Sequence, residues 1–546
     1  MDTEVDPADA APAPRRGPVP AAVWAVTALF GVLLVVSSVA APLFHAPDEF
    51  VHADLALALV DDQHYPSYDG RRVSASVKRV AIPYFGPDAR NPDKSADAAP
   101  SKDGRLDVNA LGGTEGDPGG LYNQQPQHPP LYYQSLALFI RAERKVLPGT
   151  SPPALVTEIA VLRLLNAAFV LPLPLAAWAV ATRLGGDRRV GTTAAALMLA
   201  VPQLSHIGST INNDNLLTML AAVLAVLLAG VVRGDRSWRT AALIALVTGL
   251  ALLTKAFALL LLPGIAVAYL VAARRAGRWW PTLARATAAG AGAAVISGWW
   301  WIGNQVRTGS FAPNLDSVLV GEQPGFDPDI GFFLARFGAF FPSRFWGWFG
   351  LYSARVPLWI VGLATAALIG LVVLGMVAPV DRLRRSDLVV GLVPVGCFAV
   401  FVGQHAWSLY AMSGRTPFIQ GRYLFPTLVP VMVVAAAGLV RVARRAAAAV
   451  AVVVGLLLHL VGFATMLDGF WGAPADGVAD ELRAVVAWSA WPGETIAVGA
   501  ALGAVVVAGA LAIIGLDLVS GRRARPVPAG TYRADGAGAA TGPSRS

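Results

Sequence analysis

The chain has 546 residues, of which 55% are hydrophobic and only 14% are charged, and its mean hydropathy is +0.55. Because soluble globular proteins carry about 25% charged residues, this composition excludes a soluble protein and indicates an integral membrane protein. The net charge of +8 does not indicate nucleic-acid binding, since the basic residues are distributed over short loops between apolar segments. The single cysteine, Cys397, excludes an intrachain disulfide and a cysteine-based metal site.

Apolar segments with the length of transmembrane helices, rather than of barrel strands, recur along the chain. They lie at residues 20–41, 155–182, 190–207, 213–232, 239–254, 256–273, 283–303, 356–379, 387–411, 424–441, 446–467 and 496–519. The sequence therefore predicts an all-α polytopic membrane protein with about 12 transmembrane helices in one domain, residues 20–519. The polar ends of the chain, 1–19 and 520–546, are predicted to be disordered and cytoplasmic.

Clusters of arginine support this count, because all of them fall on one side of the predicted membrane. They are Arg15/Arg16, Arg183/Arg188/Arg189, Arg233/Arg236/Arg239, Arg274/Arg275/Arg278, Arg382/Arg384/Arg385, Arg441/Arg444/Arg445 and Arg522/Arg523/Arg525. Basic loops face the cytoplasm, so both ends of the chain are predicted to be cytoplasmic. A single span over 239–273 would move every later cluster to the other side, which favours a division at Lys255.

The opposite side carries the longest loop, residues 42–154, and loops of this length are usually functional. Within it, residues 49–62 are predicted to form a short interfacial helix, and residues 130–146 a short interfacial or re-entrant one. Between them, the polar stretch 86–120 is predicted to be a mobile flap. A second outer segment, 306–355, is rich in Phe and Trp, which are typical of the headgroup level.

An acidic pair, Asp48 and Glu49, follows the first predicted span. Charge near a bilayer costs free energy, so carboxylates held at this position are usually functional. The structural alternative is a helix N-cap followed by a first-turn acid, an arrangement that the helix dipole favours. His52 and His64 could join the pair in a metal site, although their spacing matches no characteristic ligand pattern.

Further polar side chains gather on the same outer side. They are His128, Tyr132, Asn213, Asp214, Lys255, Arg344, Arg415, Gln420, Arg422 and Tyr423. Acids and cations together at a lipid boundary suit an amphiphilic substrate with an anionic head. Structural alternatives stay open. Asn212, Asn213 and Asp214 can cap the fourth span, Lys255 can snorkel, and Arg422 can anchor the tenth span.

Several short motifs, taken in their order along the chain, resemble the GT-C superfamily of membrane glycosyltransferases. They are Pro47-Asp48-Glu49, His128-Pro129-Pro130-Leu131-Tyr132-Tyr133, Arg163-Leu164-Leu165-Asn166, Asn212-Asn213-Asp214 and Gln420-Gly421-Arg422-Tyr423-Leu424-Phe425-Pro426. The resemblance is best to the protein O-mannosyltransferase and aminoarabinose-transferase branch and its bacterial relatives. The chain departs from that pattern in a longer, more polar first outer loop and in lacking a large C-terminal domain.

The resemblance implies an enzyme that moves one sugar from a polyprenyl-phosphate donor to an acceptor on the outer face of the bacterial cytoplasmic membrane. The acceptor would be a cell-envelope glycan, a lipid or a protein. Asp48 matches the family's catalytic acid position and is expected to take the acceptor's proton. Glu49 is expected to be the alternative base or an orienting partner, while Arg163 and Asn166 are expected to make hydrogen bonds between helices.

The resemblance also implies a clamp for the phosphate of the donor lipid. Lys255 and Arg422 are the expected phosphate ligands, with Arg344 and Arg415 behind them. His128 and Asp214 are expected to bind the sugar or to orient the acid, and Tyr132, Asn213, Gln420 and Tyr423 complete the expected substrate contacts. No protein metal site is predicted, and the need for a divalent cation stays open.

Two other functions remain possible on the sequence. A flippase or transporter of lipid-linked glycans needs charged residues along a path inside the spans, and the predicted spans here have few. A polysaccharide polymerase or ligase also has a large outer loop, but it depends mainly on arginines in that loop. The gathering of polar groups on one face favours the glycosyltransferase.

Overall fold

The computed structural model describes residues 18–62, 64–85, 96–99, 101–102, 105–146, 153–471 and 477–523. The predicted disordered ends lie almost wholly outside these residues, as does part of the predicted flap. One correction applies to the C-terminal boundary, because the last helix continues to Arg523 and takes in the first residues of the predicted tail.

Almost all regular structure in the described residues is helical, as predicted. The N-terminal half contains α1 (Ala21–Ala40), α2 (Glu49–Asp61), α3 (Ala75–Phe85), η2 (Gln125–Gln127), α4 (Leu131–Val146), α5 (Leu155–Val170), α6 (Leu173–Arg183), α7 (Arg188–Leu197), η3 (Met198–Ala200), α8 (Pro202–Gly208), α9 (Asn213–Val232), α10 (Trp238–Leu252), η4 (Ala256–Leu261) and α11 (Leu262–Ala276). The remainder contains α12 (Trp279–Thr308), α13 (Asp316–Val320), α14 (Ile330–Trp346), β1 (Trp348–Phe349), β2 (Ala354–Arg355), α15 (Leu358–Val377), α16 (Arg385–Ser413), η5 (Gly421–Thr427), α17 (Leu428–Ala443), η6 (Arg444–Ala446), α18 (Ala447–Trp471), α19 (Val478–Trp488) and α20 (Gly493–Arg523). The two short strands pair antiparallel.

Helices occupy each of the twelve predicted apolar segments, but several are broken rather than straight. The segment at 190–207 bends by 72° between Arg188–Ala200 and Pro202–Gly208, where Pro202 opens the second helix. Eight helices among the described residues are long and apolar enough to cross a membrane, or nine if this bent pair is one span. The all-α membrane fold is therefore confirmed, while the count of 12 spans stays a prediction.

One of these eight apolar helices, Gly421–Trp471, is long enough to cross a membrane twice. Its 51 residues would extend about 77 Å as one straight helix, against about 30 Å of hydrocarbon. The chain instead turns at Arg444, whose φ of 50° lies in the left-handed region, and α17 and α18 pack against each other.

Close packing of α15 on α17 depends on two glycines. A Cβ on Gly375 would collide with the Val434 carbonyl, and a Cβ on Gly438 would collide with the Leu371 carbonyl. Neither neighbour can rotate away, because both are backbone atoms. Small residues at such a crossing allow two membrane helices to approach closely.

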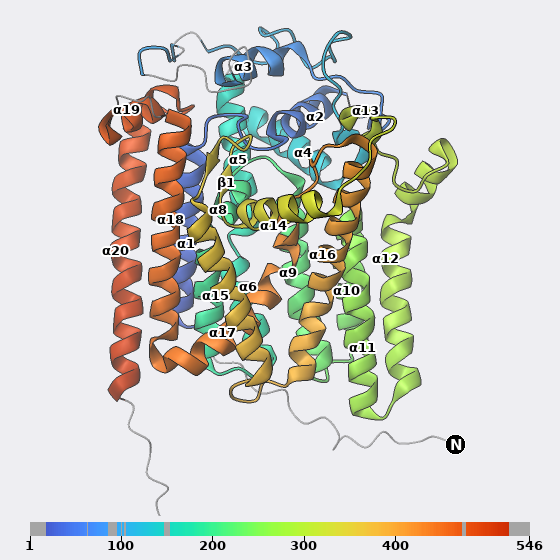
Figure 1. Ribbon diagram of the computed structural model, residues 1–546, viewed down its shortest axis with the longest axis vertical. Helices are drawn as coiled ribbons and strands as arrows, with labels where there is room; N and C mark the ends of the chain where they lie inside the picture. The colour runs from blue at the N-terminus through green and yellow to red at the C-terminus, as the bar shows by residue number, and fades with distance from the viewer. Residues whose placement is uncertain are drawn as a thin grey trace, which may run out of the picture.

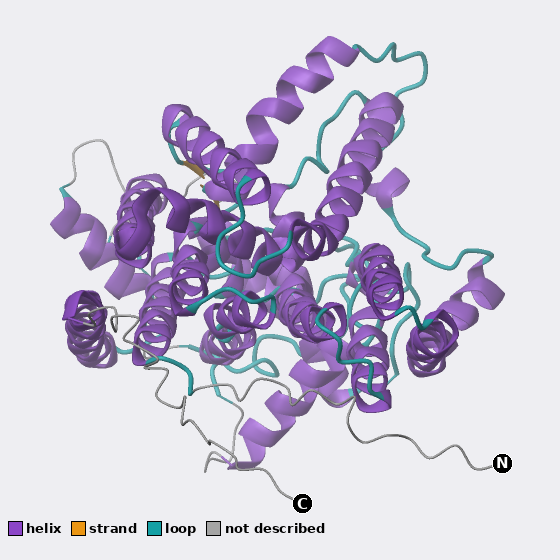
Figure 2. Ribbon diagram, turned by 90° about the horizontal axis from the view of Figure 1, so that it is seen from below, coloured by secondary structure: helices purple, strands orange, loops and turns teal. Residues whose placement is uncertain are grey.

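The two ends of the bundle differ in content. α2, α3, α4, α13 and α19 lie at one end, and the connections after α11, α15 and α17 lie at the other (Figure 1). Seen from below, many of the helices appear end-on, so their axes run roughly parallel (Figure 2). α14 lies across the bundle instead, below the end that carries α2 and α4 (Figure 1).

The first outer loop is organised around a buried carboxylate. Asp54 in α2 accepts hydrogen bonds from Arg71 Nε (2.7 Å), the Ser74 amide (2.9 Å) and Asn123 Nδ2 (2.8 Å). These bonds connect the two sides of the loop to α2. The predicted short helices at 49–62 and 130–146 are confirmed as α2 and α4, which pack against each other.

Candidate active site

Asp48 lies at a strained turn between α1 and α2. Its φ of 64° places it in the left-handed region, which Asp tolerates better than most residues. Although Asp48 directly precedes α2, its side chain makes no capping hydrogen bond. The carboxylate instead accepts from Arg422 Nη2 at 3.0 Å and more weakly from Gln124 Nε2 at 3.5 Å. Its side chain is 41% exposed, so the acid remains open to a ligand.

Glu49 has the opposite environment. Its carboxylate is fully buried and accepts two hydrogen bonds from Arg163, at 2.7 and 2.6 Å, and one from the Ile211 amide at 3.2 Å. Arg163 also donates to the carbonyls of Ser38, Ala41 and Pro42. The pair joins the end of α1, the start of α2 and α5, which confirms the predicted interhelical role of Arg163.

A layer of buried polar groups supports the acidic turn. The Tyr132 hydroxyl donates to Asn166 Oδ1 at 2.8 Å, and the same oxygen accepts from Asn215 Nδ2 at 3.1 Å. These bonds confirm the predicted interhelical role of Asn166. Tyr132 has no exposed surface, so the structure places this predicted substrate contact inside the protein rather than at its surface.

Lys255 and Asp214 form a buried ion pair where α10 meets η4. Lys255 Nζ lies 2.6 Å from Asp214 Oδ1 and 3.3 Å from Asn213 Oδ1, and Lys255 is only 6% exposed. The snorkelling alternative is therefore wrong for Lys255. The cap of α9 is Asn212, which accepts from the Asp214 amide. Asp214 Oδ2 is buried and has no hydrogen-bond partner in the described chain.

Arg422 is the second cation of the site. It is 3% exposed, so it does not anchor η5 at the protein surface, which was its structural alternative. Its Nη2 donates to Asp48, whereas its Nε and Nη1 have no partner among the described residues. The Tyr423 ring lies 5.1 Å from Lys255 Nζ and 5.5 Å from the Arg422 guanidinium carbon. Two cations thus share one aromatic ring beside Asp48 and Asp214.

Arg344 and Gln420 support the segment that carries Arg422. The Arg344 guanidinium lies 4.0 Å from the centre of the Tyr352 ring and donates to the Ile419 carbonyl at 2.8 Å. Gln420 Nε2 donates to the Tyr352 hydroxyl at 2.5 Å. Burial lowers the pKa of Arg344, and the charge of the nearby Arg422 lowers it further, although Tyr352 opposes the shift.

Arg415 is not brought into this group. It is exposed, and its guanidinium donates to the Val320 carbonyl at the end of α13. Its side chain is thereby directed to the loop before α14, rather than to the surroundings of Asp48.

Two histidines border the cations. Burial lowers the pKa of His128, and the charge of Lys255 adds to the effect. Burial likewise lowers the pKa of His52, followed by the charges of His128, Lys255 and Arg422. Both imidazoles are therefore neutral near pH 7. His52 Nδ1 lies 2.9 Å from the Tyr133 hydroxyl, which fixes its ring below the site.

The histidine pair considered for a metal site does not converge. His64 is fully exposed beside Asp62, whereas His52 is buried against Tyr133. Within the residues that the structure describes, no group of three or more His, Cys, Asp or Glu side chains could hold a metal ion.

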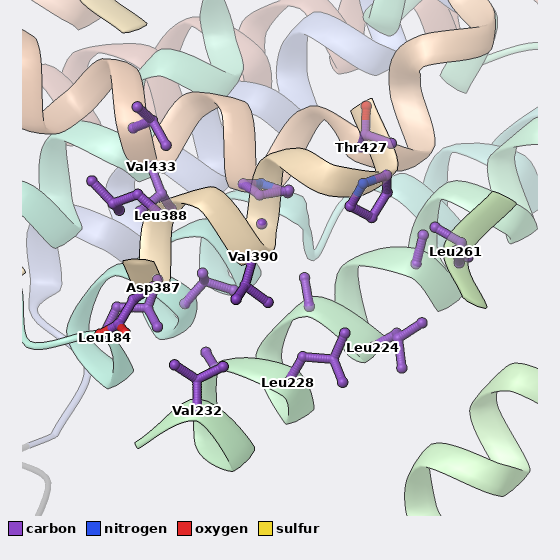
Figure 3. Close-up of a pocket in the computed structure, with 18 of the residues that line it drawn as sticks. Leu184, Leu224, Leu228, Val232, Leu261, Asp387, Leu388, Val390, Thr427 and Val433 are labelled. Atoms are coloured by element: carbon purple, nitrogen blue, oxygen red, sulfur yellow. The ribbon is translucent and has the colours of Figure 1, made fainter. Parts of the chain in front are cut away.

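An apolar groove begins next to η5. Figure 3 shows Thr427 and Leu261 on one side of it, and Val232 and Asp387 toward another. Its lining comes mainly from α9, α16 and α17, and its volume is about 50 Å³. Pro426 and Thr427 in the lining follow Arg422 by four and five residues. The apolar lining thus includes the last two residues of η5, the segment that carries Arg422.

The structure also brings in residues that the sequence did not single out. Gln124 contacts Asp48, and Tyr352 contacts both Arg344 and Gln420. Gln124 precedes the His-Pro-Pro motif by only four residues, which was a usable signal. Tyr352 lies among many aromatic residues that suit a membrane interface, so its role depends on a contact visible only in the fold.

Comparison with known proteins agrees with the motifs. Residues 155–302 match the dolichyl-phosphate-mannose-protein mannosyltransferase family. The matched part contains Arg163, Asn166, Asp214 and Lys255, but not the segment of Asp48. No curated protein matches the sequence. The family match confirms the predicted resemblance to the GT-C superfamily of membrane glycosyltransferases.

Three solved structures show a distant likeness. ArnT from Cupriavidus metallidurans bound to undecaprenyl phosphate is 15% identical, with 90% of this chain and 77% of that chain covered and a TM-score of 0.43. An oligosaccharyltransferase from Archaeoglobus fulgidus is 13% identical, with coverages of 85% and 55% and a TM-score of 0.39. Arabinosyltransferase EmbB from Mycobacterium smegmatis is 13% identical, with coverages of 94% and 42% and a TM-score of 0.39.

Proposed function

We propose that this protein is a membrane glycosyltransferase that moves a sugar from a polyprenyl-phosphate donor to an acceptor hydroxyl. The observation that carries the proposal is the pairing of a half-exposed Asp48 with a buried Arg422 that keeps two donor nitrogens free. Lys255 and Arg422 both lie within 5.5 Å of the centre of the Tyr423 ring. A base and two cations at one place are what transfer from a lipid phosphate requires.

In the proposed step, Asp48 takes the proton of the acceptor hydroxyl. The acceptor oxygen then forms a bond to the anomeric carbon, while the bond from that carbon to the phosphate oxygen breaks and its electron pair stays on the phosphate. Arg422 and Lys255 stabilise the negative charge that grows on this oxygen. Direct attack by the acceptor inverts the configuration at the anomeric carbon.

Glu49 is proposed as a positioning residue rather than the base. All of its carboxylate is buried, and two charge-assisted hydrogen bonds hold it to Arg163. A proton taken by Glu49 would leave Arg163 with an uncompensated buried charge, which is costly. Asp48 is not tied to a structural arginine in this way, since its ionic partner, Arg422, is itself proposed to bind the substrate phosphate.

The remaining predicted site residues divide by position. His128, Asp214 and Tyr423 are proposed to contact the sugar or phosphate, because they border the cations. Asn213 and Tyr132 are proposed to hold the surrounding helices. Arg344 and Gln420 are proposed to position the segment that carries Arg422. Arg415 is proposed to have no catalytic role.

The apolar groove beside Thr427 supports a donor with a hydrocarbon tail. Its lining runs along α9, α16 and α17 within the bundle and includes Thr427, at the end of the segment that carries Arg422. A phosphate held by Arg422 and Lys255 would place the first isoprene units next to Pro426 and Thr427. The arginine-rich loops lie at the other end of the bundle, which supports an outer location for the site. The proposed acceptor is an envelope glycan, a lipid or a protein.

The test is transfer by purified protein from a panel of polyprenyl-phosphate sugars. We expect Asp48→Asn to lower the rate by about 10²–10⁴-fold, the usual contribution of a positioned general base. Asp62→Asn is the matched control, since Asp62 is an exposed acid at the end of α2 and should leave the rate unchanged. Wild-type rate in a folded Asp48→Asn protein would overturn the proposal. An active Asp48→Asn with an inactive Arg422→Ala would favour the polymerase or ligase instead.

A further inference from the structure

The end of the bundle opposite Asp48 holds a pocket lined by four arginines. Arg233, Arg236, Arg275 and Arg384 surround a volume of about 260 Å³. They come from three separate places, the connection after α9, the last turn of α11 and the connection before α16. Basic residues in single loops follow from membrane orientation alone, but that rule does not require three loops to place guanidinium groups around one cavity.

The pocket carries more positive charge than its own carboxylate neutralises. Asp387 is buried and forms ion pairs with Arg233, at 2.9 Å, and with Arg275. Arg236 and Arg384 make no ion pair within the described part of the chain. One carboxylate therefore faces four guanidinium groups. Burial, opposed by Asp387, lowers the pKa of Arg233, and the charges of Arg384 and Arg275 lower it further.

A second carboxylate near the pocket, Asp235, is committed elsewhere. Asp235 accepts from the Thr240 hydroxyl at 2.8 Å and from the Ser237 amide at 3.2 Å, which forms the turn before α10. The two free arginines are thus available for a ligand. Like charges held around one cavity raise the free energy of the folded protein, and an anion bound between them would remove that cost.

The basic pocket adjoins the apolar groove. Val232 lines both cavities, and Asp387 lines the groove while it pairs with two arginines of the pocket. Figure 3 shows Val232, Asp387 and Leu228 together in the groove, away from Thr427. A ligand with an anionic group and a hydrocarbon chain could therefore occupy both environments at once.

We propose that Arg233, Arg236, Arg275 and Arg384 bind the phosphate group of an anionic phospholipid in the leaflet at this end of the bundle. The guanidinium fork matches phosphate oxygens, and basic pockets between membrane helices suit anionic headgroups. One acyl chain would lie toward Val232. A zwitterionic headgroup would bring its own cation into an already positive pocket, so an anionic lipid is preferred. The proposal does not depend on the transferase activity.

The test counts lipid bound to the full-length protein. The wild type and Arg236→Gln/Arg384→Gln are purified in mild detergent, titrated with phosphatidylglycerol or phosphatidylcholine, and analysed by native mass spectrometry. Arg189→Gln/Arg445→Gln is the matched control, because it removes two exposed arginines from the same end of the bundle but outside the pocket. The pocket variant should fold normally, since neither side chain makes an ion pair with any residue that the structure describes.

We expect phosphatidylglycerol affinity to fall about tenfold or more in the pocket variant and to stay unchanged in the control. An equal loss in both variants would overturn the proposal, because it would indicate general attraction to a basic surface. Equal affinity for phosphatidylcholine would also overturn it. Inorganic phosphate, added to lipid-free protein, distinguishes a lipid headgroup from a free phosphate ion as the ligand of the pocket. Binding of phosphate as tight as that of the lipid would support the site but reject a lipid as its ligand.

Discussion

Two adjacent carboxylates, Asp48 and Glu49, have opposite surroundings. Asp48 precedes the helix in a left-handed conformation and points to Arg422, whereas Glu49 begins the helix and points to Arg163. Successive residues at a helix start project in different directions, so one acid reaches the open site and its neighbour reaches the interior. This difference separates a candidate base from a residue that holds the turn in place.

The pair of Glu49 and Arg163 gives a stability prediction. Glu49→Gln leaves Arg163 buried without its counter-ion, and we expect a loss of about 3–5 kcal/mol in unfolding free energy. Asp48→Asn also removes a counter-ion of a buried arginine, but it should cost less, because Asp48 is 41% exposed and makes a single hydrogen bond to Arg422. Thermal unfolding in detergent measures both variants. Equal destabilisation of the two would contradict the assignment of separate roles.

At the scale of elements, the contact between α15 and α17 depends on backbone proximity. Gly375 and Gly438 face each other's helices so closely that a Cβ on either meets a carbonyl. α17 follows directly from η5, which carries Arg422. The crossing of these two helices therefore also determines where one cation of the candidate site lies.

Matched substitutions within α15 test this crossing. We expect Gly375→Ala to lower the unfolding temperature, because the new methyl group meets the Val434 carbonyl and the helices must separate. Gly370→Ala, in the same helix, meets nothing within 4 Å and should be neutral or stabilising by up to about 1 kcal/mol. The same unfolding temperature in both variants would show that the crossing tolerates extra volume.

At the scale of the whole molecule, the two ends of the helical bundle carry different groups. α2, α3 and α4 of the predicted first outer loop occupy one end, with Asp48 directly before α2, and the arginine-rich connections occupy the other (Figure 1). The distribution of basic residues predicts that the second end is cytoplasmic.

Cysteine labelling tests that orientation. In a Cys397→Ala background, Asp62→Cys should react with a membrane-impermeant maleimide in intact cells. Arg445→Cys should react only after the membrane is opened. Both positions are exposed, so access from solvent rather than burial decides the result. The reverse pattern would place the candidate site in the cytoplasm.

The sequence by itself determined the class of fold, the apolar segments and the candidate site residues. Hydropathy and charge are local properties, so the apolar segments matched helices even where Pro202 breaks one of them. The turn at Arg444 falls in the predicted gap between 424–441 and 446–467. The motifs similarly identified Asp48 and Arg422, and the division between two predicted spans identified Lys255. The number of transmembrane spans was harder to predict from the sequence, because length and hydropathy do not decide how a bent or broken helix crosses a membrane.

Only the tertiary structure decided which of these residues meet. Arg422 is 374 residues from Asp48, and Arg163 is 114 residues from Glu49, so no local pattern could pair them. The same packing directs Arg415 away and brings Tyr352 in. It also gathers four arginines from three separate places in the chain around one pocket. Partners so far apart in the chain are chosen by how the helices pack, which is why the roles of Asp48 and Glu49 separate only in the folded protein.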